Sequence, residues 1–115
     1  MSALEDSFEF QLKAFKLLGY EREHRFHPTR KWRFDFSFKE SLLAIELHGA
    51  IYTNGRHTRG AGVEADMIKI NTAQEMGWTV LCFSAGIVKS GEAVAQVGRM
   101  LKARNDAIIN KPVDS

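Results

Sequence analysis

RFDFSFKESLLAIELHGAIY, residues 33–52, is the stretch that decides the fold. Every second residue from Phe34 to Phe38 is a phenylalanine, which predicts a strand over residues 31–38 with these rings on one face. Residues 39–41 are short enough for a hairpin connection, and residues 42–48 predict a second strand. The most apolar part of the chain is therefore expected to form an antiparallel hairpin.

The rest of the chain alternates helical and strand patterns. Apolar residues recur every three or four positions over residues 4–18, which predicts an amphipathic helix that ends at Gly19. A glycine-rich loop, residues 50–62, follows the hairpin. The other expected elements are a strand over 24–27, a turn over 28–30, a helix over 63–76 capped by Gly77, a buried strand over 78–84 and a helix over 92–109.

This order predicts an α/β domain, a mixed β-sheet flanked by helices in the order αβββαβ. The last strand follows a crossover helix, so it is expected to lie parallel to a neighbour. With 115 residues, 44% of them hydrophobic and 26% charged, the chain fits one domain over residues 1–109. Residues 110–115 are expected to be a disordered tail.

The composition also indicates in which cellular environment the protein works. The single cysteine, Cys82, excludes an internal disulfide, which favours a reducing, cytoplasmic location. The N-terminal residues are unlike a secretory signal, and no apolar run approaches the roughly 20 residues that cross a bilayer, so no membrane association is expected. Net charge is only +2, but basic residues crowd into residues 22–33 and 56–59.

Acidic residues of the predicted hairpin could hold a metal ion. Asp35 and Glu46 lie on adjacent strands, and on one face they would come within reach of one hard cation, with the Leu47 carbonyl as a further oxygen ligand and His48 beside it. Such a group suits Mg²⁺-dependent phosphodiester hydrolysis. The alternatives are that the acids only solubilise an outer strand face, that His48 is structural, and that Glu5 is a helix-start acid.

The loop and the helix after it carry a second group of polar residues. His57 stands between Arg56 and Arg59 amid glycines, a composition suited to contacting a phosphate backbone; a solvated surface loop is the alternative. Asp66 falls on the inner face of the predicted helix, where it could order the loop or act as a first-turn acid. Lys69, one turn further on, could add positive charge to the site.

The sequence gives little support for a zinc site, a nucleotide-binding motif or a serine nucleophile. His24 and His27 have no cysteine partners nearby, so no zinc site is expected. The sequence contains no phosphate-binding P-loop, dinucleotide glycine fingerprint or serine-nucleophile elbow.

The ordered set of Glu5, Asp35 and the Glu46-Leu47-His48 triplet resembles the PD-(D/E)XK nuclease superfamily, which has the restriction-endonuclease-like fold. His48 stands where that superfamily usually has lysine. Within it, the chain looks most like the Vsr-like very-short-patch repair endonucleases and their small relatives. The matching features cover roughly residues 4–85 and are FDF at 34–36, HG at 48–49, a loop histidine, and Asp66 eleven residues before the GWTVL that starts at Gly77.

This resemblance implies DNA cleavage that depends on Mg²⁺ or Mn²⁺. Asp35 would be the principal metal ligand, Glu46 and the Leu47 carbonyl further ligands, and Glu5 and His57 would assist. The mismatch-repair enzymes carry a structural zinc site that this chain lacks. Whether His48 or His57 is the general base is open.

The favoured hypothesis is a small Mg²⁺-dependent DNA endonuclease with a D...ExH site, which grips phosphates through Arg30, Lys31, Arg56, Arg59 and Lys69. One alternative is a non-catalytic DNA-binding or accessory module on the same fold. Another is a branched-DNA resolvase, which would act as a homodimer because it must cut two strands. A protein partner that supplies specificity is also left open.

Overall fold

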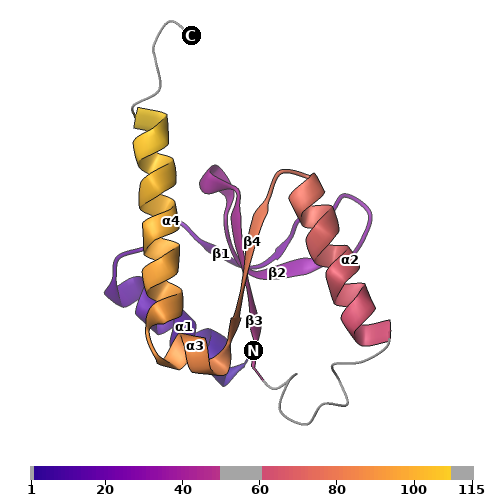
Figure 1. Ribbon diagram of the computed structural model, residues 1–115, viewed down its shortest axis with the longest axis horizontal. Helices are drawn as coiled ribbons and strands as arrows, with labels where there is room; N and C mark the ends of the chain where they lie inside the picture. The colour runs from indigo at the N-terminus through magenta and orange to yellow at the C-terminus, as the bar shows by residue number, and fades with distance from the viewer. Residues whose placement is uncertain (1, 50–60, 110–115) are drawn as a thin grey trace, which may run out of the picture.

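The computed structural model describes residues 2–49 and 61–109 (Figure 1). Along the chain, its elements are α1 (Ala3–Ala14), β1 (Glu21–Arg25), β2 (Arg33–Phe38), the 3₁₀ turn η1 (Lys39–Ser41), β3 (Leu43–His48), α2 (Ala61–Glu75), β4 (Thr79–Ser84), α3 (Ala85–Lys89) and α4 (Glu92–Ile109). The predicted tail, residues 110–115, lies outside the described residues. The single-domain prediction for residues 1–109 stays a prediction.

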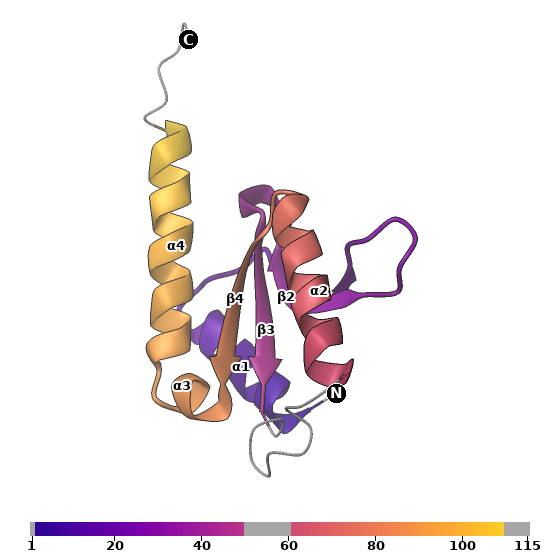
Figure 2. The same ribbon diagram turned by 45° about the vertical axis from the view of Figure 1, so that its right-hand side comes forward.

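A four-stranded mixed sheet forms the centre of the fold, in the order β1-β2-β3-β4. The first three strands are antiparallel neighbours, and β4 lies parallel to β3 after the crossover through α2. Figure 2 shows α2 on one face of the sheet and α1, α3 and α4 on the other. The predicted α/β class with a mixed sheet and a parallel last strand is therefore confirmed.

Two apolar clusters fill the two faces of this sheet. On the α1 face, Phe8 and Leu12 pack with Phe36 and Ile45 and with Val97 of α4, all fully buried. Burial of such side chains stabilises a fold by roughly 1.5–3 kcal/mol each. On the other face, Ala73 of α2 packs with Phe34, Ala44 and Trp78.

Phe34 therefore lies on the opposite face from Phe36, and the prediction that the alternating phenylalanine rings share one face was wrong. Strand pairing runs from Arg22–Phe36 directly to His24–Phe34, without a Glu23–Asp35 pair between them. Glu23 has a left-handed backbone with φ of 53°. Because this interruption breaks the regular alternation, the residues on either side of it face opposite ways.

The first helix ends earlier than its apolar pattern predicts. Lys16 adopts a left-handed backbone with φ of 58°, and the Leu17 amide donates to the Leu12 carbonyl at 2.8 Å, a closure typical of helix C-termini. Phe15 and Leu18, which belong to the apolar pattern predicted over residues 4–18, are consequently 66% and 63% exposed. By contrast, Gly77 closes α2 with a φ of 102°, as predicted.

Over residues 2–49 and 61–109, none of the helices combines the length and the apolar character that a membrane crossing requires.

Candidate metal and nucleic-acid site

The candidate site lies where β2 and β3 part. The regular pairing of these strands begins at Phe36–Ile45, and beyond it two side chains bridge the strands instead. The amide of Asp35 donates to Glu46 Oε2 at 3.0 Å, and the amide of Leu47 donates to Asp35 Oδ2 at 2.7 Å. Each carboxylate thus takes the place of a backbone acceptor, which fixes both side chains at this point.

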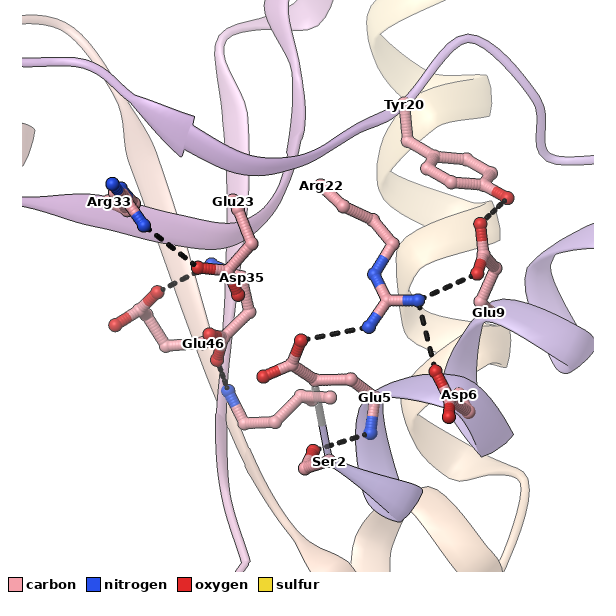
Figure 3. A network of polar contacts seen from close by, with 11 residues as sticks. Ser2, Glu5, Asp6, Glu9, Tyr20, Arg22, Glu23, Arg33, Asp35 and Glu46 are labelled. Atoms are coloured by element: carbon pink, nitrogen blue, oxygen red, sulfur yellow. Dashed lines mark hydrogen bonds and ion pairs between the residues drawn. The ribbon is translucent and has the colours of Figure 1, made fainter.

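Three carboxylates from three different elements converge beside these bridges (Figure 3). Glu5 of α1, Glu23 of β1 and Asp35 of β2 each offer an oxygen, and these oxygens all lie within 4.8 Å of one another. Glu5 stands in the first turn of α1, where its amide donates to the capping Ser2 Oγ at 3.0 Å. The structure thereby brings the predicted Glu5 and Asp35 together.

Glu23 is a member of this cluster that sequence reasoning missed. The strand predicted over residues 24–27 begins earlier, at Glu21, so Glu23 lies within it. Its left-handed backbone is not revealed by local propensity. One signal was present: a hairpin centred on the predicted turn over residues 28–30 places Glu23 opposite Asp35. Pairing the strands around that turn would have identified the residue.

The surroundings of Asp35 and Glu23 disfavour the ionised forms of their carboxyl groups. Burial raises the pKa of Asp35 to about 6; the Leu47 amide opposes this rise, and the nearby carboxylates of Glu46 and Glu5 add to it. The side chain of Glu23 is 46% exposed, yet partial burial of its carboxylate and the charges of Glu5 and Asp35 raise its pKa as well. A bound cation would offset this repulsion.

Glu46 has a cationic partner of its own. Lys69 Nζ of α2 lies 2.6 Å from Glu46 Oε1, and the two side chains are only 15% and 10% exposed. Burial raises the pKa of Glu46, and Lys69 opposes that rise. Lys69, predicted to add positive charge to the site, is therefore placed directly against Glu46. His48 ends β3 two residues later, half-buried and in register with Ser84 of β4.

Arg22 ties α1 to the sheet through a second network (Figure 3). Its guanidinium contacts Glu5 at 2.9 Å, Asp6 at 3.1 Å and Glu9 at 2.8 Å, and Tyr20 Oη donates to Glu9 at 2.7 Å. Burial alone would lower the pKa of Arg22, but these carboxylates raise it. Arg22 belongs to the basic stretch 22–33, yet it points inward, and its partner Glu5 is held beside the acid cluster.

The other predicted residues divide into two groups. His57, Arg56 and Arg59 lie outside the described residues. Asp66 is half-buried in the second turn of α2, near enough to Glu46 for its charge to raise the pKa of that carboxyl.

Arg30 and Lys31, predicted to bind DNA, are exposed in the connection between β1 and β2. Arg25 and Arg33, at the two ends of that connection, are exposed too. The basic stretch therefore presents four cations to solvent, apart from the inward Arg22.

The sheet and the helices that flank it define a mixed α/β domain with an acid cluster where two strands part. No protein-family model and no curated protein match the chain. The chain is similar to a solved structure described as "Homing Endonuclease I-Bth0305I Catalytic Domain", with a TM-score of 0.66 and 17% sequence identity over 90% of this chain and 98% of that chain. At this identity the likeness shows the fold, and the predicted nuclease fold is confirmed.

Proposed function

We propose that this protein is a metal-dependent DNA endonuclease. The observation that carries the proposal is the convergence of Glu5, Glu23 and Asp35 within 4.8 Å, on the fold of a homing-endonuclease catalytic domain. Three carboxylates from separate elements repel one another, so bringing their charges this close costs folding free energy unless a cation offsets it.

The residues present fit Mg²⁺ or Mn²⁺. Hard divalent cations prefer carboxylate and carbonyl oxygens, which Glu5, Glu23 and Asp35 supply. Glu46 and the Leu47 carbonyl are the further ligands implied by the resemblance. A carboxylate has about four lone-pair positions, so Glu46 retains acceptor capacity beside its contacts with Lys69 and the Asp35 amide. When bound, such an ion neutralises phosphate charge and lowers the pKa of water.

The chain's own residues orient this chemistry. The Leu47 amide fixes one oxygen of Asp35, and Lys69 contacts Glu46 and opposes the rise in its pKa that burial causes. His48, at the end of β3, and His57, outside the described residues, are the two candidates for the general base. Whichever of them serves would accept the proton of the attacking water.

The Vsr-like resemblance and a repair role belong to the same proposal, as does the cytoplasmic setting. They are supported only by the residue pattern around FDF, HG and Asp66, and by the single cysteine. The form of DNA that is cut would distinguish a repair enzyme from a branched-DNA resolvase, and a solution mass would identify a dimer.

The test is cleavage of supercoiled, linear, mismatched and branched DNA by the purified chain in Mg²⁺, in Mn²⁺ and in EDTA. Asp35→Asn and Glu46→Gln serve as the site variants, and Glu40→Gln, in an exposed turn, serves as the control. We expect metal-dependent cutting by the wild type and the control, and its loss in both site variants. DNA binding without cutting in either metal would replace the proposal with a non-catalytic accessory module.

A further inference from the structure

The connection between β1 and β2, residues 26–32, is an ordered structure that we call the hairpin tip. His27 Nδ1 accepts the amides of Thr29 and Arg30 at 3.2 and 3.0 Å, and Arg25 Nε donates to the Arg30 carbonyl at 3.5 Å. Figure 2 shows the tip projecting away from the sheet beside α2. Local hydrogen bonds therefore hold the backbone around Arg30 in one conformation.

A row of aromatic rings connects the hairpin tip to the core. Trp32 stacks near Phe26 with ring centroids 6.2 Å apart and an interplanar angle of 19°, and Phe26 stacks on Phe34 at 3.9 Å and 3°. Phe34 in turn meets the edge of the buried Trp78 at 4.9 Å. The position of Trp32 is thus set by contacts that reach the interior.

The guanidinium group of Arg30 lies over the ring of Trp32. The guanidinium carbon of Arg30 lies 4.6 Å from the Trp32 ring centroid, a cation–π contact, while Arg30 itself is exposed. Residues 25–33 contain four cations and no acid. Within the described part of the chain, Arg33 is the one cation of these four that has an ion-pair partner, Glu23 at 3.9 Å.

The hairpin tip lies at the same end of the sheet as the candidate site. Because β2 runs antiparallel to β3, the start of β2 and the end of β3 lie at the same end of the sheet. Arg33 begins β2, and Asp35 follows it by two residues, about 7 Å along an extended strand. A DNA backbone that reaches the acid cluster would therefore pass beside the tip.

We propose that the hairpin tip is a preformed contact for DNA phosphates, in which Arg30 makes the contact and Trp32 is a positioning residue. This inference rests on the proposed function, since it takes DNA as the partner. A guanidinium fork fits phosphate oxygens, and a ring that already fixes it lowers the entropy lost on binding. Trp32 has no charge and cannot pair with a phosphate, so its contribution to the phosphate contact should come through Arg30.

The test measures affinity of the full chain for a labelled DNA duplex by fluorescence anisotropy, in EDTA so that no cleavage occurs. Arg30→Ala should weaken binding about tenfold, the size of a lost charge-assisted contact, and reduce the slope of log K against log salt by about 0.9. Trp32→Leu should also weaken binding, although net charge is unchanged. The double variant should bind like Arg30→Ala alone, since the two changes remove the same phosphate contact.

Arg99→Ala is the matched control, because it removes another exposed arginine, from α4, which lies on the opposite face of the sheet from α2. A loss in Arg99→Ala equal to that in Arg30→Ala would overturn the proposal, as would additive losses in the double variant. If Trp32→Leu does not fold, Arg30→Lys decides the question. Lysine keeps the charge but lacks the planar fork, so wild-type affinity in Arg30→Lys would overturn the proposal.

Combined with the cleavage assay in Mg²⁺ and Mn²⁺, the binding measurement separates this proposal from the nuclease proposal. A wild type that binds no DNA would overturn both. A wild type that binds and cuts, with Arg30→Ala and Trp32→Leu binding equally well, would overturn the role of the hairpin tip alone.

Discussion

Replacing Asp35 by asparagine should stabilise the fold above neutral pH while it abolishes cleavage. Burial and the neighbouring carboxylates raise the pKa of Asp35 to about 6, so keeping this group ionised costs folding free energy. Asparagine carries no charge and still offers an oxygen to the Leu47 amide, which donates to Asp35 at 2.7 Å in the wild type. The substitution thus removes the repulsion and keeps the bridge between β2 and β3.

The size and the pH dependence follow from that pKa. Its rise from an ordinary 3.8 to about 6 corresponds to an upper limit of about 3 kcal/mol. Because Asp35 is only half-buried, screening by solvent reduces the expected effect to about 1–2 kcal/mol. A raised folded-state pKa gives stability that is present below about pH 4 and lost as pH rises through about 6, so the advantage of the variant should grow across that window and be complete above it.

Urea unfolding at about pH 4 and about pH 8 tests this reasoning, with Glu21→Gln as a control outside the cluster. At pH 8, Asp35→Asn should be more stable than the wild type, and at pH 4 the two should agree. Excess Mn²⁺ should raise the melting temperature of the wild type and the control but not of Asp35→Asn. A variant less stable than the wild type at pH 8, or an advantage equal at both pH values, would refute the argument.

Three further substitutions test the contacts around the site. Lys69→Met leaves the buried Glu46 carboxylate without its cation, so the free energy of unfolding at pH 8 should fall by roughly 3 kcal/mol and recover in acid, as urea titrations at two pH values would show. Arg22→Met should cost about 2 kcal/mol in the same measurement and weaken Mn²⁺ binding measured by calorimetry, because Glu5 loses the contact that orients it. Phe36→Ala opens a cavity in the larger apolar cluster and should cost about 3–5 kcal/mol in thermal or urea unfolding.

Matched variants make these outcomes interpretable. Lys89→Met removes an exposed lysine and should leave stability nearly unchanged, so an equal loss there would contradict the role given to the Lys69–Glu46 pair. Asp6→Asn removes one partner of Arg22 that lies outside the acid cluster. If Mn²⁺ binding fell as far in Asp6→Asn as in Arg22→Met, the orientation of Glu5 could not be the cause.

Much of the fold could be predicted because its signals are local. Alternating apolar residues identified the hairpin, Gly77 identified the end of α2, and the crossover implied a parallel β4, which pairs with β3 as expected. The end of α1 could not be read in this way. A left-handed Lys16 closes that helix, whereas the sequence offered Gly19 as the stronger stop signal.

The site was only partly predictable, since its remaining members are brought in by tertiary packing. Asp35 and Glu46 stood out because charges are rare in apolar strands. Glu23 depends on the pairing of β1 with β2 and on an interrupted ladder that also turns Phe34 to the other face. The inward Arg22 looked like one cation of a basic stretch, because composition does not show which way a side chain points.

The most direct test of the central claim compares Glu23→Gln with Glu21→Gln, two residues of the same strand. Glu23 lies in the acid cluster, whereas Glu21 pairs with Lys39 at 3.2 Å on an exposed surface. Plasmid cleavage in Mn²⁺ should proceed normally in Glu21→Gln and be strongly reduced in Glu23→Gln, together with Mn²⁺ affinity. Equal cleavage and equal Mn²⁺ affinity in the two variants, or a wild type that neither binds Mn²⁺ nor cuts DNA, would contradict the account.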